Sequence, residues 1–179
     1  MELRPSLQVK IVLKALTDVV LPAVDPNNKL AQEQVRLCIG TLQIMASRMP
    51  LAFQFDCDEL NRLLELADGL QKSVPGKAGV GDALAALDAA RDRAVDTRDR
   101  AKAAPEEIEA VSFALRETIG ALIPELYANN DLDALKDISK LITGNAREQL
   151  IRDRSWLIGQ GWEPDPKAIP PIETLLGAK

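Results

Sequence analysis

Apolar residues recur at helical spacing along most of the chain. Between Lys29 and Met49 they form two neighbouring stripes, one stepping by four and three residues and the other repeating every seventh residue. The first stripe is Ala31, Val35, Cys38, Leu42, Met45 and Met49, and the second is Leu30, Leu37, Ile44 and Leu51. A helix that is apolar over so wide an arc needs more than one neighbour. We therefore expect residues 29–49 to form the central helix of a bundle.

Similar patterns predict further helices before and after this one. Their expected ranges are Pro5 to Pro22, Asp56 or Asp58 to Leu70, Asp82 to Ala103, Pro105 to Leu126, and Asp131 to about Ile158. Pro50 should end or bend the central helix, and Pro124 should kink its helix without dividing it. The predicted fold is all-α, an up-down bundle of about five to six helices joined by short turns.

The last residues differ from this pattern, and we expect two parts: a helical bundle over 1–158 and a tail over 159–179. The tail contains several prolines and is predicted to be extended. It is also apolar in places, so it either packs on the bundle or docks on a partner. Large rings beside glycines are typical interface anchors. The candidate interface residues are Trp156, Trp162, Ile169 and Ile172, and a lid on the core is the open alternative.

Charge and composition disfavour some binding partners and indicate a cellular location. The net charge of -5 and the pI near 4.9 disfavour non-specific binding to nucleic acid or to an anionic membrane. The first residues are amphipathic and show neither a signal-peptide layout nor a membrane span, so a cytoplasmic location is expected. Cys38 and Cys57 are expected to be reduced thiols.

The chain contains no histidine, which excludes the Ser-His-Asp and Cys-His mechanisms and the common zinc sites. The densest acidic cluster, Asp56, Asp58 and Glu59, could bind a hard cation, but acids at the start of a helix are better explained as caps. We therefore predict no catalytic residue, no metal site and no cofactor. A carboxylate or cysteine enzyme is the least favoured alternative.

Arginines are concentrated late in the last predicted helix, at Arg147, Arg152 and Arg154. Together they could bind a phosphate or a carboxylate. The helix dipole alone also favours cations in a last turn. These residues are the candidate anion site, with a purely structural role as the alternative.

The first fifty residues, with the helix end Val19 to Val24 and the helix from Leu30 to Met49, resemble a family of small helical bacterial proteins of unknown function. Members of that family tend to be encoded beside acyl-CoA dehydrogenases and aminoglycoside-phosphotransferase-like kinases. The resemblance implies an accessory or partner protein, and it supplies no catalytic residue.

These observations predict a non-catalytic helical protein that acts by association, either with itself as a homo-oligomer or with a partner protein. The surplus of apolar helical faces and the apolar tail favour this function. The alternative is a bundle that binds an apolar acyl-type ligand or a small anion, because the breaks at Pro50 and Pro124 could open an interior cavity.

Overall fold

The structure is a computed structural model that describes residues 5–74, 81–100, 102–128 and 132–177, with the backbone alone for 132–134. Within these ranges all regular secondary structure is helical, which confirms the predicted all-α bundle. The chain divides into two compact units. Unit 1 contains residues 1–52 and 152–179, and unit 2 contains residues 53–151. This division differs from the predicted boundary at residue 158.

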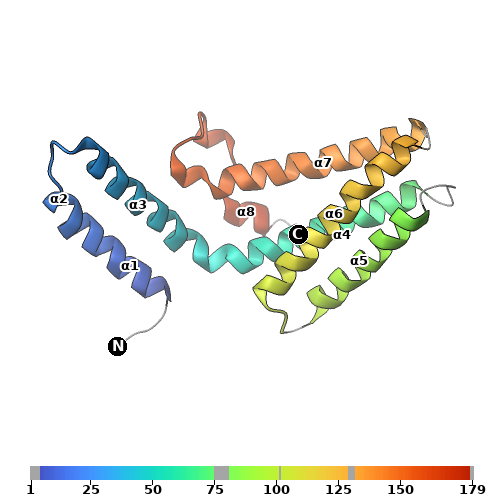
Figure 1. The fold of residues 1–179 in the computed structure, drawn as a ribbon, viewed down its shortest axis with the longest axis horizontal. Helices are drawn as coiled ribbons and strands as arrows, with labels where there is room; N and C mark the ends of the chain where they lie inside the picture. Colours follow the sequence, from blue (N-terminus) through green and yellow to red (C-terminus); the bar gives the residue numbers. More distant parts are fainter. Residues whose placement is uncertain (1–4, 75–80, 101, 129–131, 178–179) are drawn as a thin grey trace. The chain divides into compact units, whose positions relative to one another are not determined.

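Unit 1 begins with a helical hairpin. Its first arm is one helical run: α1 (Pro5–Ala15), a π-helical turn (Leu16–Val20) and α2 (Leu21–Ala23). Pro22 lacks an N–H and would crowd an α-helical carbonyl four residues earlier, so the wider π turn just before it is physically reasonable. The second arm is α3 (Lys29–Arg48), and Figure 1 shows it alongside α1. Asn28 caps α3, because its side-chain oxygen accepts the Ala31 N–H at 3.1 Å.

The prediction that residues 29–49 form the central helix is wrong. Ile39 is the one residue of α3 that is buried, while Leu30 and Leu37 are exposed. The double stripe shows that two faces of the helix are apolar, but within unit 1 α1 and the C-terminal segment cover only part of them. The central helix of the main core is instead α4, in unit 2.

The C-terminal part of unit 1 starts within the last turns of α7 (Leu132–Trp156). It continues through two 3-10 turns, Ile158–Gln160 and Pro166–Ala168, to the short helix α8 (Ile172–Leu176). The tail is therefore less extended than predicted. Pro166 starts a turn and Pro171 directly precedes α8, positions at which a missing N–H leaves no helical hydrogen bond unmade.

Unit 2 is built from α4 (Ala52–Ser73), α5 (Gly81–Asp99), α6 (Pro105–Ala128) and most of α7. Its core combines buried side chains of all four helices, and α4 supplies the largest share: Leu60, Leu63, Leu64, Leu66, Ala67 and Leu70. Figure 1 shows α5 beside α6. The apolar face of α5 is narrow and consists mainly of alanines. It packs into this core through Leu87, Ala90 and Ala94.

Proline effects were predicted with mixed success. Pro50 lies in a 3-10 turn (Met49–Leu51), and α4 starts directly afterwards at Ala52. Phe53 and Phe55 are therefore helical, and the expected start of this helix at Asp56 or Asp58 is wrong. Pro124 lies inside one unbroken α6, as predicted. Over the residues the structure describes, no helix has the length and apolar character needed to cross a bilayer.

Candidate interaction surface

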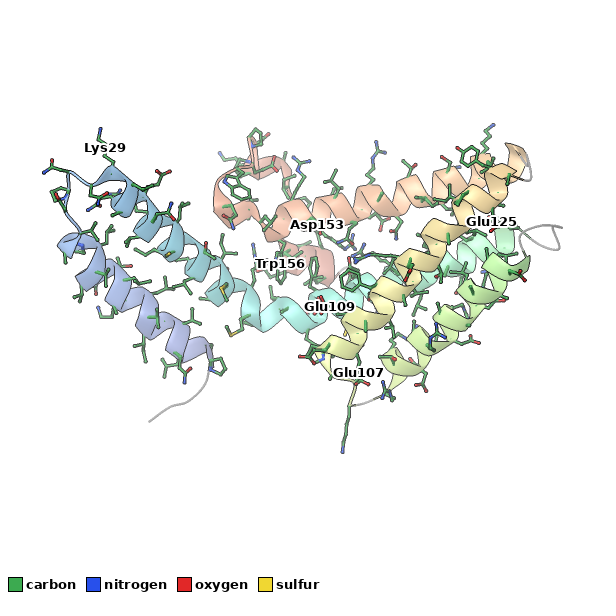
Figure 2. The ribbon with its side chains drawn as sticks, viewed as in Figure 1. Lys29, Glu107, Glu109, Glu125, Asp153 and Trp156 are labelled. Carbon is green, nitrogen blue, oxygen red and sulfur yellow. The ribbon has the colours of Figure 1, made fainter. Side chains whose placement is uncertain are left out.

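Arg48, the last residue of α3, organises the C-terminal part of unit 1. Its Nε donates to the carbonyl oxygen of Trp156 at 3.0 Å, and its Nη2 donates to that of Ser155 at 3.1 Å. The last carbonyls of a helix lack intrahelical partners, so Arg48 caps the end of α7. Its guanidinium also lies 5.6 Å from the ring centre of Trp156, which is labelled in Figure 2, and Nη1 is 3.7 Å from Glu173 Oε1.

Further contacts hold the tail in place. The Ser155 hydroxyl donates to the carbonyl of Pro170 at 2.7 Å. Arg154 donates from Nε and Nη2 to the two carboxylate oxygens of Glu163, at 2.9 and 2.6 Å. This bidentate pair holds the pKa of Glu163 below its ordinary value. The tail is thus a structured part of unit 1.

The four candidate interface residues fall into three environments. Ile169 and Ile172 are buried, and Trp156 is half-buried beneath Arg48. Trp162 is 75% exposed. Trp162 is therefore the member of this set that presents a large free surface, while the two isoleucines pack inside the chain.

The three candidate anion-binding arginines also differ. Arg147 lines a shallow groove on α7 together with Lys136 and Lys140. Arg152 is buried. Arg154 forms the bidentate pair with Glu163, so its donors already have an anionic partner. Each arginine has its own surroundings, and the described structure does not present the three as one site.

The hairpin carries most of the exposed large apolar side chains. Of sixteen such residues in the described structure, nine lie between residues 5 and 49. We call these nine the hairpin surface: Leu7, Ile11, Val12, Val19, Val20, Leu30, Leu37, Met45 and Met49. The interface residues predicted from the sequence lie at the end of the last helix and in the tail, and none of them lies in the hairpin. The signal missed in that prediction was the apolar residues of the first helix that exceed one stripe, such as Val12 beside Ile11.

A groove beside the hairpin surface extends it toward the tail. It has a volume of about 320 Å³ and lies between α3 and the turn that follows α7. Leu37, Gly40 and Ile44 line it from α3 together with the charged Glu33 and Arg36, and Trp162 lines it from the tail. A Cβ added at Gly159 would lie 3.3 Å from Ile44 Cγ1, so the two segments are closely apposed here. The exposed ring of Trp162 thus continues the apolar character of the hairpin.

The acidic cluster in unit 2 offers little chemistry. Burial raises the pKa of Asp56, and the carboxylates of Glu59 and Glu109 raise it further. Burial also raises the pKa of the neighbouring Cys57 thiol, with Asp56 as a second cause. A thiol that stays protonated is a poor nucleophile. Arg62 Nε donates to Asp58 Oδ2 at 2.9 Å. Among the described residues, no three or more Cys, Asp or Glu side chains are placed so that they could hold a metal ion.

Comparisons with protein-family models, with curated proteins and with solved structures found no match for this chain.

Proposed function

We propose that this protein is a non-catalytic association protein whose hairpin surface pairs with the hairpin surface of a second copy. The observation that carries the proposal is the concentration of exposed apolar side chains on α1, α3 and the turns that follow them. Several large exposed apolar side chains gathered on one part of a folded protein support an interaction site there. A hairpin is a single layer of two helices, and two such layers facing each other bury their apolar sides as a four-helix bundle.

The size of the surface fits a specific interface. A standard interface buries roughly 800 Å² per partner, and nine large apolar side chains that are each about a third to two thirds exposed approach that area. Trp162 and the adjoining groove add to it. Aromatic and methionine side chains are enriched in interface cores, and both occur here.

The charge distribution favours pairing through unit 1. Unit 1 contains ten basic and eight acidic residues, a net charge of +2, whereas unit 2 contains twelve basic and nineteen acidic residues, a net charge of -7. Bringing two copies of unit 1 together therefore costs little electrostatic repulsion. A contact between two copies of unit 2 would oppose much larger like charges.

The test is the absolute mass of the full-length chain, measured by light scattering across a concentration series, for wild type and two matched variants. Leu37 in the hairpin surface and Leu150 on α7 have the same exposed fraction, 56%. We expect Leu37→Glu to weaken the dimer at least about tenfold, because the carboxylate would lose its water in the interface. Leu150→Glu should leave the mass unchanged.

Two outcomes would contradict the proposal. A wild-type chain that stays monomeric at every concentration would show that the hairpin surface is not a self-association site. A dimer that Leu150→Glu disrupts as strongly as Leu37→Glu would place the interface elsewhere. Circular dichroism of each variant checks that the helices are intact.

A further inference from the structure

A second feature, separate from the hairpin surface, is a groove between α4 and α7 in unit 2. It has a volume of about 520 Å³, within the range of ~300–1,000 Å³ that is typical of small-molecule sites. Its walls are held together next to the groove: a Cβ at Gly69 would lie 3.3 Å from Leu141 Cδ1, and Asn145 Nδ2 donates to the carbonyl of Arg62 at 3.3 Å. The two helices are therefore in direct contact beside the groove.

Arg62, on α4, is the unusual residue of this groove. It is 3% exposed, and its Nε bonds Asp58 Oδ2 at 2.9 Å. Its Nη2 is also buried, and within the described structure it has no hydrogen-bond partner. A buried donor without an acceptor destabilises the folded protein, and more so when the group is charged. An oxygen acceptor that reached Nη2 through the groove would recover that free energy.

The other lining residues determine what kind of ligand would fit. Three carboxylates, of Glu65, Asp137 and Glu148, line the groove, and Lys140 is the second cation beside Arg62. The lining is therefore net negative, which disfavours a simple anion. A molecule that carries both a carboxylate and an ammonium group can pair with the cations and with the carboxylates of this lining. Leu66 and Leu141 also line the groove and offer apolar contact to the rest of the ligand.

We propose that the α4–α7 groove binds a small zwitterion of the amino-acid type, with its carboxylate on Arg62 and its ammonium group near the lining carboxylates. A free amino acid and a short peptide that ends in lysine share this chemistry, because the C-terminal lysine carries a carboxylate and a side-chain ammonium group. The proposal is independent of self-association, because the groove and the hairpin surface share no residue.

Gly144 allows the groove to be blocked without disturbing the core. It lines the groove on α7, and a Cβ built there meets nothing within 4 Å. Gly120 on α6 is a matched control, because it too has open space and it does not line the groove. Leucine is a better helix former than glycine, so Gly144→Leu and Gly120→Leu should both fold. Replacing Arg62 itself would leave Asp58 without this partner inside the protein.

The experiment is ligand-observed NMR on the full-length chain with the common free amino acids and the dipeptide Gly-Lys as probes. Acetate and butylamine serve as probes that carry a single charge. We expect at least one zwitterion to bind wild type and Gly120→Leu equally, and to bind Gly144→Leu at least about tenfold more weakly. Acetate and butylamine should each bind at least about tenfold more weakly than that zwitterion, because each satisfies only one side of the groove. In a second experiment on the 15N-labelled chain, the Arg62 Nε–H resonance should shift when that zwitterion is added.

Binding by free amino acids would identify the small molecule as the source of the zwitterion, and binding by Gly-Lys alone would identify a peptide terminus. The absence of binding by every zwitterion at millimolar concentration would overturn the proposal, and would indicate that water satisfies Arg62. Equal binding of acetate, or undiminished binding to Gly144→Leu, would overturn it as well.

Discussion

Arg48 joins the end of α3 to the end of α7, segments that lie 108 residues apart in the sequence. Its planar guanidinium reaches two helix-terminal carbonyls at once while its face covers the Trp156 ring. A lysine has the charge but not this fork. The side chain is 14% exposed, so water cannot readily replace it.

We expect Arg48→Ala to destabilise unit 1 by about 2–4 kcal/mol, because two charge-assisted hydrogen bonds and a cation–π contact are lost. Arg48→Lys should recover only part of this loss. Urea unfolding followed by tryptophan fluorescence measures the effect, since Trp156 lies directly under Arg48. A fluorescence midpoint that Arg48→Ala leaves unchanged would show that the cap does not stabilise the tail.

The pair of Arg154 and Glu163 predicts a pH dependence. Arg154 holds the pKa of Glu163 below its ordinary value of 4.5. Folding thus lowers this pKa, so the stabilising contribution of the pair is present above pH 4.5 and is lost as the pH falls through the lowered value. We expect the fluorescence of the neighbouring Trp162 to change in an acid titration below pH 4.5. In Glu163→Gln this change should be absent, and an identical titration would assign it to another group.

At the scale of elements, the start of α6 shows half of a capping box. Glu107, labelled in Figure 2, accepts the N–H of Ala104 at 2.8 Å. This contact is the main cause that lowers the pKa of Glu107, and Arg100 is the second. In a complete box the residue before the helix returns a side-chain hydrogen bond, which an alanine cannot form.

Ala104→Ser should therefore stabilise unit 2 by up to ~1 kcal/mol, since the hydroxyl can also accept the N–H of Glu107, which already donates to the carbonyl oxygen of Ala104 at 3.0 Å. Thermal unfolding monitored by circular dichroism is the measurement. Ala104→Val, which adds bulk without an acceptor, is the control and should give no gain. Equal stabilisation by both variants would mean that burial of the side chain matters more than the cap.

The bounds of several helices were predictable from the sequence. Which helices pack against one another was not. Apolar spacing and capping residues located α3 and α6 closely, because both signals are local. The same spacing could not tell that α4, rather than α3, lies in the core, because a stripe shows that a face is apolar without showing what covers it. The acidic residues Asp56 and Asp58 suggested a later helix start, but a proline is accepted just before a new helix, and α4 starts at Ala52, directly after the turn that contains Pro50.

The candidate sites were less predictable, for a similar reason. The i,i+4 spacing of Asp58 and Arg62 is visible in the sequence, but the unpartnered nitrogen of Arg62 depends on how α7 packs beside α4. Arg48 donates to backbone carbonyls of a distant segment. Every residue has a backbone carbonyl, so the sequence does not show which ones Arg48 will reach. The hairpin surface consists of apolar side chains that no other segment of the described structure covers. A sequence pattern shows that these residues are apolar but not whether another segment packs on them.

At the scale of the whole molecule, the two units offer separate spectroscopic signals. Trp156 and Trp162, the two tryptophans of the chain, both belong to unit 1, while circular dichroism reports on the helices of both units. Leu60 is fully buried in the core of unit 2. Leu60→Ala should cost about 2–5 kcal/mol in that unit.

We therefore expect Leu60→Ala to lower the urea midpoint measured by circular dichroism more than the midpoint measured by tryptophan fluorescence. Arg48→Ala should show the opposite order. Because non-coincident transitions are the sign of more than two states, this pair of variants tests whether the units unfold separately. Equal shifts by both probes would show that the chain unfolds as one cooperative body.

The two halves of unit 1 are separated in the sequence by roughly a hundred residues of unit 2. The first half must therefore be synthesised well before the second half that packs on it. On the ribosome, the hairpin emerges before the carbonyls that Arg48 caps and before the buried Ile172, which are made about a hundred residues later. Until then the hairpin has neither its tail nor its final contacts. Nascent chains on neighbouring ribosomes would present the same uncovered leucines and valines to one another, so pairing of two copies could begin before either chain is finished.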